Sequence, residues 1–347
     1  MSGMKSLGTI VGVGMRTGVS HDALSTSLLL RTGVPAITAA PLAGPDDEPV
    51  TMAFDPTLDP YLVGEERASR LGAAAARELA SGLGQAARTL RTRAALAFPE
   101  ARPDQKRHEV GHALATSFRG VLGESFGSPP VDLATRGAAG LAYCLPDALA
   151  ELSAGRVEAV VAGGLHTDYD PAVIRLLGAT GRLFSPDNVD AVLPGEAAAF
   201  VLITRDETAR RLDLTPMARI YGIGTDTNDE EPDRSFESGA IARAIRAATD
   251  DLPDEIVVGW AVTHLGFEHA PVRELYSALT RTHKRFGPPL VVDAPAQRAG
   301  NLGAAALPLA LGFMALAHRH GFAPAPFGLA IAGSDGGERA AMLVAAA

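Results

Sequence analysis

Short apolar runs in the sequence predict buried strands. The clearest lie at residues 9–15, 156–164, 198–204 and 254–259. These runs are rich in β-branched residues, and two of them end in glycines, as buried strands often do. Segments between them, such as residues 67–90 and 272–286, carry Ala and Leu at helical spacing. This alternation of strands and helices predicts an α/β protein with a buried sheet.

One short pattern occurs twice. Residues 10–17 and 220–227 both read Ile-x-Gly-x-Gly-x-x-Thr, each time where a strand is expected to end. The repeat suggests a duplicated fold, although glycine pairs after strands are common enough to leave a chance match open. The charged segment at residues 205–216 is closed by a proline and is a natural linker. We therefore expect two halves, residues 1–210 and 211–347.

The composition narrows the class of protein. The chain is 47% hydrophobic with a formal net charge of -9 and has no long Lys/Arg cluster, which argues against a nucleic-acid partner. Its one cysteine, Cys144, cannot form an intramolecular disulfide, and no signal-cleavage pattern follows residues 9–15, so we expect a cytoplasmic protein. The longest apolar stretch, residues 302–317, falls short of the roughly 20 residues that cross a bilayer. It predicts a buried helix and no membrane contact.

A zinc motif is the strongest competing signal. His108, Glu109 and His112 match H-E-x-x-H, in which two histidines one helical turn apart bind zinc. A metalloprotease needs a third protein ligand, and candidates such as Glu124 occur without any further signature. We interpret the pair as two histidines on a partly exposed helix. The sequence therefore predicts no metal site and no cofactor.

Several short motifs follow one another in a fixed order from residue 129 to the C-terminus. They are PPVDLA at 129–134, LFSPD at 183–187, PGEAA at 194–198, AGNLGAA at 299–305 and GSDGG at 333–337. In this order they resemble motifs of the β-ketoacyl-acyl carrier protein synthases, which belong to the thiolase-like superfamily. The resemblance implies a duplicated fold of α/β/α/β/α layers.

The resemblance also implies a Cys-His-His centre, in which a thiolate at a helix N-terminus accepts an acyl group. The matching segment here is LATRGAAGL at residues 133–141. It aligns in more than one register, which places Thr135, Gly137 or Ala138 at the position of the cysteine, and none of them supplies a thiol. Cys144 lies further along the predicted helix, where we expect a small buried hydrophobic side chain.

The other positions implied by the resemblance are also altered. His264 matches the first family histidine, whereas the second histidine is Asn301, the family lysine is Ala296 and the phenylalanine of the C-terminal turn is Asp335. Asparagine can donate a hydrogen bond but carries no positive charge. A carboxylate at residue 335 would repel a thioester oxyanion. We expect His264, Asn301 and Asp335 to line one pocket beside the turn at residues 135–138.

Two functions remain open at this point. The first is a non-condensing protein, or pseudoenzyme, of fatty acid or polyketide synthesis that binds an acyl group, an acyl carrier protein or an active ketosynthase. The second is an acyltransferase or hydrolase of altered chemistry that uses His264 with the hydroxyl of Thr135 or with water. In both cases the resemblance implies a homodimer. We assign the pairing to the apolar strand at residues 156–164, which would leave an exposed edge if it were unpaired.

Overall fold

The computed structural model describes residues 4–45, 47–101, 119, 122–230 and 234–347. The zinc motif at His108 and His112 lies outside these residues. The first part of the chain contains β1 (Gly8–Thr17), α1 (Ala23–Thr32), β2 (Thr38–Ala43), β3 (Pro49–Met52), α2 (Gly64–Leu83), α3 (Ala86–Thr89), β4 (Thr92–Ala97), β5 (Val131–Ala134), η1 (Gly137–Ala139), α5 (Leu141–Ser153), β6 (Ala159–Thr167), α6 (Pro171–Ala179), β7 (Glu196–Thr204) and α7 (Asp206–Arg211).

The second part begins with β8. It contains β8 (Ala218–Thr227), α8 (Ser235–Ser238), α9 (Ala240–Ala248), β9 (Val258–Thr263), α10 (His269–Arg281), η3 (His283–Arg285), β10 (Phe286–Asp293), α11 (Ala296–Ala299), η4 (Gly303–Ala305), α12 (Ala306–His320), β11 (Phe327–Gly333) and β12 (Glu338–Ala346). The predicted boundary between residues 210 and 211 falls at the end of α7, in the connection from β7 to β8, and stays a prediction.

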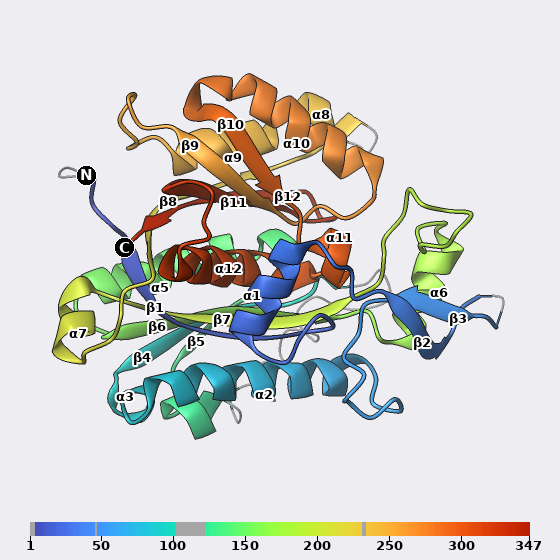
Figure 1. Cartoon of the computed structure of the whole chain (residues 1–347), viewed down its shortest axis with the longest axis horizontal. Helices are drawn as coiled ribbons and strands as arrows, with labels where there is room; N and C mark the ends of the chain where they lie inside the picture. The colour runs from blue at the N-terminus through green and yellow to red at the C-terminus, as the bar shows by residue number, and fades with distance from the viewer. Residues whose placement is uncertain (1–3, 46, 102–118, 120–121, 231–233) are drawn as a thin grey trace.

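These elements form five layers, which confirms the predicted α/β/α/β/α class (Figure 1). A ten-stranded sheet folds over so that α5 and α12 lie between its two halves. Helix α2 covers the outer face of one half, and α9 and α10 cover the outer face of the other. The largest apolar cluster fills the central layer. The predicted strands at residues 9–15 and 198–204 correspond to β1 and β7.

The strand order repeats within the sheet. It reads β5-β4-β6-β7-β1 in one half and β10-β9-β11-β12-β8 in the other, and the two halves join where β1 pairs antiparallel with β8. The directions repeat as well, because β4 and β9 each have two parallel neighbours, whereas β7 and β12 each have two antiparallel ones. The two halves therefore share one topology.

The repeated glycine pattern marks equivalent contacts in the two halves. A Cβ added to Gly14 on β1 would collide with the carbonyl oxygen of Ala75 on α2. A Cβ added to Gly224 on β8 would collide in the same way with the carbonyl oxygen of Ala244 on α9. In each half, a helix therefore packs directly on the backbone of the first strand, which only glycine permits.

The structure also bears on the predictions about the apolar stretch and the sheet edge. The apolar stretch near residue 302 does form a buried helix, since residues 306–317 of α12 are all buried. None of the helices in the described part of the chain combines the length and apolarity that crossing a bilayer requires. The prediction that residues 156–164 form an exposed edge strand is wrong, because β6 lies between β4 and β7. Within the described residues, the edge strand of this half is β5, which pairs with β4 alone.

Candidate active site

The chain turns sharply between β5 and α5, where the resemblance placed the nucleophile. Gly137 adopts a left-handed conformation with φ 58°, and its N–H donates to the carbonyl of Phe98 at 3.1 Å. Of the three candidate positions, Thr135 directly follows β5, Gly137 is the left-handed residue of the turn, and Ala138 is buried in η1. Glycine adopts this conformation without the steric cost that a side chain adds.

A carboxylate fills the space beside Gly137. A Cβ built on this residue would lie 2.5 Å from Oε1 of Glu100, three residues beyond β4. The other oxygen, Oε2, accepts the N–H of Gly336 at 2.9 Å. The room that a side chain at position 137 would need is therefore occupied by Glu100. Sequence reasoning missed this residue because it lies in the part of the chain where the family motifs are weakest.

The C-terminal glycine turn holds the turn after β5 in place. The hydroxyl of Ser334 donates to the carbonyl of Arg136 at 2.6 Å and accepts the N–H of Ala139 at 2.9 Å. These two bonds join residues from opposite halves of the duplicated fold. The structure thus brings the segments around Gly137 and Asp335 together.

His264 follows β9 and is oriented by backbone groups. The backbone N–H of His264 donates to the carbonyl of Ile331 at 3.2 Å. The backbone N–H of Gly333 donates to Nδ1 of the His264 imidazole at 3.3 Å. Burial, helped by the positive charge of Arg339, lowers the pKa of His264 to about 4. The ring is therefore neutral at pH 7. Because Nδ1 accepts a hydrogen bond, the ring proton lies on Nε2, and His264 can act there as a hydrogen-bond donor.

Asp335 points outward and is paired. Its side chain is 71% exposed, and Oδ2 lies 2.8 Å from the guanidinium of Arg182. Arg182 also contacts both oxygens of Glu268, at 2.8 and 3.0 Å. The carboxylate that the sequence suggested as a repulsive charge in the pocket is thus largely exposed and is compensated by an arginine.

Asn301 takes part in a polar cluster that the sequence did not reveal. Its Oδ1 accepts the N–H of Gly303 at 3.1 Å, so its amide NH₂ faces Asp168 and His166, each at 3.0 Å. Nε2 of His166 lies 2.9 Å from Oδ1 of Asp168 and must carry the proton, because a carboxylate only accepts. Both residues follow the glycine pair of β6, and this position at the end of a strand was the one available signal.

The cluster leaves one buried atom of His166 unsatisfied. Its Nδ1 has no hydrogen-bond partner in the described part of the structure. Burial on its own would lower the pKa of His166, but the carboxylate of Asp168, together with Glu196 and Glu100, raises it above the ordinary value. Asn301 therefore donates to Asp168, and its NH₂ and the Nε2–H of His166 are two donors that converge on the same carboxylate.

Neither alternative nucleophile is activated. Cys144 is 7% exposed inside α5, and burial raises the pKa of its thiol to about 12, so almost no thiolate exists at pH 7. Thr135 is half-buried, and in the described part of the chain the imidazole of His264 is hydrogen-bonded to Gly333 rather than to Thr135. The described residues also contain no cluster of three or more His, Cys, Asp or Glu side chains placed to hold a metal ion.

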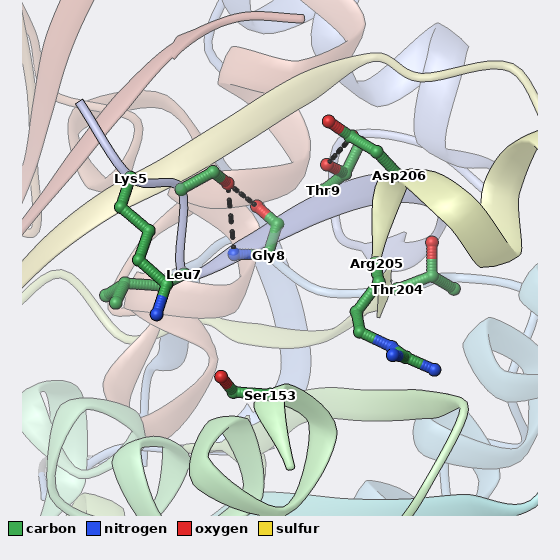
Figure 2. A pocket seen from close by; sticks show the side chains of 9 residues that line it. Lys5, Leu7, Gly8, Thr9, Ser153, Thr204, Arg205 and Asp206 are labelled. Carbon is green, nitrogen blue, oxygen red and sulfur yellow. Dashed lines mark hydrogen bonds between the residues drawn. The ribbon is translucent and has the colours of Figure 1, made fainter. Parts of the chain in front are cut away.

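A separate surface pocket of about 310 Å³ lies elsewhere on the molecule (Figure 2). Lys5, Ser153 and Arg205 are among its lining residues, together with the start of β1 and the end of β7. His166 pairs with Ala197 near the opposite end of β7, seven residues from Thr204, or roughly 23 Å at the usual rise of a strand. None of the predicted site residues lines this pocket.

Comparison with known proteins gives structural matches alone. No protein-family model and no curated protein matches the chain. It superposes on the ishigamide ketosynthase/chain length factor with a TM-score of 0.79 and 17% identity, covering 98% of this chain and 99% of that one. A type II polyketide synthase acyl-carrier protein in complex with its ketosynthase bound to the hexaketide gives 0.76 and 14%, covering 98% and 99%.

A third solved structure is the oxazolomycin ketosynthase domain from Streptomyces albus, with a TM-score of 0.71 and 16% identity over 99% of this chain and 75% of that one. Sequence identities this low establish the fold alone. The predicted resemblance to ketosynthases is confirmed at that level.

Proposed function

We propose that this chain, which has the thiolase-like fold of the ketosynthases, is a non-condensing member of an acyl-chain-building assembly. It would bind an acyl carrier protein or an active ketosynthase without forming an acyl-enzyme. The observation that carries the proposal is the turn after β5, where Gly137 stands in the left-handed position and Glu100 fills the space beside it. A ketosynthase reaction needs a nucleophile at such a turn.

Loss of the thiol removes the transfer step, and the remaining groups do not replace it. His264 is neutral and can donate from Nε2, so a carbonyl could still be polarised there. A hydrogen bond of this kind stabilises an oxyanion but forms no covalent intermediate. The carboxylate of Glu100 would moreover repel the carboxylate of a malonyl group brought to the same turn.

The rival function is an acyltransferase or hydrolase that uses His264 as a general base. Such a base must offer a free lone pair to the hydroxyl of Thr135 or to a water molecule. In the structure the lone pair of Nδ1 already accepts the N–H of Gly333, and the low pKa makes the ring a weak base. The geometry therefore favours binding over altered catalysis.

Two features of the comparisons support a binding role. One matched structure is named as a ketosynthase/chain length factor, and another contains a ketosynthase with its acyl-carrier protein. By analogy, we propose that this chain pairs with a second copy of itself or with a ketosynthase, in fatty acid or polyketide synthesis in the cytoplasm. Strand β5 offers an edge for such pairing, because its neighbour in the described part of the chain is β4 alone.

The proposal is tested by measuring binding and turnover together. Light scattering at micromolar concentration should give the mass of a dimer, either of this chain alone or of this chain mixed with a purified ketosynthase. Condensation of an acyl thioester with malonyl-carrier protein should not exceed the rate without protein. A monomer that binds neither carrier protein nor ketosynthase would contradict the binding role, and turnover would contradict the loss of catalysis.

A further inference from the structure

The connection between α6 and β7 contains a small hairpin, residues 181–192, seen as the yellow-green loop that follows α6 in Figure 1. Phe184 donates its N–H to the carbonyl of Val192 at 3.0 Å, and the side-chain amide of Asn188 donates to the carbonyls of Gly181 and Leu183 at 2.8 and 3.2 Å. The hairpin is therefore held together by its own hydrogen bonds.

This hairpin belongs to the first half of the fold, yet it is anchored to the second half. Arg182 binds Glu268 and Asp335 through its Nε and both terminal nitrogens, at 2.8 to 3.3 Å. Two further contacts lie beside this cluster. Phe184 packs on Phe267 with ring centroids 5.4 Å apart, and Asp190 accepts the N–H of His269 at 2.7 Å.

The anchored segments are the neighbours of His264 in the chain and in its hydrogen bonds, and the ring itself is half-buried. Residues 267–269 follow it directly in the chain, and the turn that carries Asp335 also carries Gly333, whose N–H donates to the imidazole. The hairpin contacts both segments, and among the described residues Arg182 is the one hairpin side chain that forms ion pairs with both. Displacement of the hairpin would free both sides of His264 together.

The ion pairs at Arg182 differ from those inside the molecule. The buried pair of Arg67 and Glu196 is at most 1% exposed, whereas Arg182 is 37% and Asp335 71% exposed. Exposed pairs are weakened by dissolved salt, while buried pairs are much less so. The contact between the hairpin and the second half thus depends on a cluster that the solvent can reach.

We propose that Arg182, Glu268 and Asp335 form an electrostatic latch that keeps the hairpin closed against His264 and opens when these ion pairs are broken. The latch regulates access to the site described above and in that sense rests on the proposed function. Its test measures the accessibility of His264 rather than acylation or partner binding, so either idea can fail while the other stands.

The test is the rate at which diethyl pyrocarbonate modifies His264 at pH 7, measured by peptide mass spectrometry. This reagent attacks the unprotonated nitrogen of a neutral imidazole, which is Nδ1 here, so modification requires Gly333 to release that nitrogen. Gly333 lies on the same turn as Asp335, which Arg182 holds, so the rate reports opening of the latch. His283 on η3 is exposed and serves as the reference for the reagent. His318, packed against Trp260, reports unfolding because it should stay unmodified.

Arg182→Gln removes the latch. We expect the rate at His264 to rise roughly tenfold, the factor that corresponds to losing one well-formed charged contact. Arg182→Lys should fall between wild type and Arg182→Gln, because an ammonium cannot pair bidentately with two carboxylates. Arg175→Gln is the matched control, since Arg175 is an exposed arginine on α6 that is free of ion pairs among the described residues, and it should change nothing.

Wild-type protein provides a second measurement in case the variant unfolds. Raising sodium chloride from 0.01 M to 1 M shortens the Debye length from about 30 Å to about 3 Å and should accelerate modification of His264 relative to His283. The latch is supported if salt or Arg182→Gln exposes His264 while His318 stays protected. It is overturned if the modification rate of His264 does not change with salt concentration. It is also overturned if this rate is the same in folded Arg182→Gln and folded Arg175→Gln.

Discussion

At the residue scale, the environment of Gly137 determines what the site can do. The residue needs glycine for two separate reasons, its left-handed backbone and the carboxylate of Glu100 in the space beside it. The same two facts explain why no thiol is found there. A cysteine at this position would have to displace Glu100, which also binds the N–H of Gly336.

Comparing Gly137→Ala with a second glycine substitution should separate the cost of the left-handed backbone from the cost of the collision with Glu100. Left-handed strain alone costs about 1–2 kcal/mol, and the collision with Glu100 adds to it, so we expect a loss of about 3 kcal/mol in the free energy of unfolding. Gly181→Ala is the matched control, because Gly181 has φ 67° with open space around its Cα. Urea unfolding of both variants gives the comparison, and equal losses would show that Glu100 does not fill the site.

The lowered pKa of His264 predicts that the stability of the protein depends on pH. This pKa is about 4 in the folded protein and near 6.5 when unfolded, so the folded state favours the neutral ring. The resulting stability is present above pH 6.5 and is lost as the pH falls toward 4, by about 3 kcal/mol in total. His264→Gln removes this contribution. Between pH 6.5 and 4, wild type should therefore lose about 3 kcal/mol of unfolding free energy relative to the variant, and parallel curves would contradict the account.

At the scale of elements, the two glycine patterns connect sequence repeat and packing. Gly14 and Gly224 occupy equivalent places on the first strand of each half, each pressed against a helix backbone. The pattern of eight residues thus marks, in each half, a strand position at which the packed helix leaves no room for a side chain.

Gly14→Ala and Gly224→Ala should be about equally harmful. Each puts a methyl group into a peptide carbonyl, so the helix must shift, and we expect a loss of about 3 kcal/mol or more in each half. Gly82→Ala on α2 is the control, because open space surrounds that position and alanine favours a helix by about 1 kcal/mol. Thermal unfolding would contradict the equivalence if one substitution were tolerated and the other were not.

At the scale of the whole molecule, the order of the motifs predicted the layered fold correctly. Short apolar runs and glycine turns reflect which strands are buried, and burial is a property that sequence records well. The edge of the sheet was predicted incorrectly because an apolar run such as that of β6 shows burial but not which strands lie beside it, and only the pairing of the folded chain shows that β6 is central.

The site was harder to predict than the fold. The sequence leaves the register of residues 133–141 open, and the structure adds that Gly137 is the left-handed residue of the turn. Glu100, His166 and Asp168 became visible only through their contacts with Gly137 and Asn301, which lie far away in sequence. Such contacts depend on tertiary packing and leave no local pattern.

The loss of the nucleophile is the central claim, and intact-mass spectrometry after incubation with an acyl thioester tests it most directly. An active ketosynthase incubated in parallel should gain the mass of one acyl group. We predict that this protein keeps its unmodified mass, and that Thr135→Val behaves identically. Stoichiometric acylation of wild type, lost in Thr135→Val or mapped to Cys144, would contradict the account.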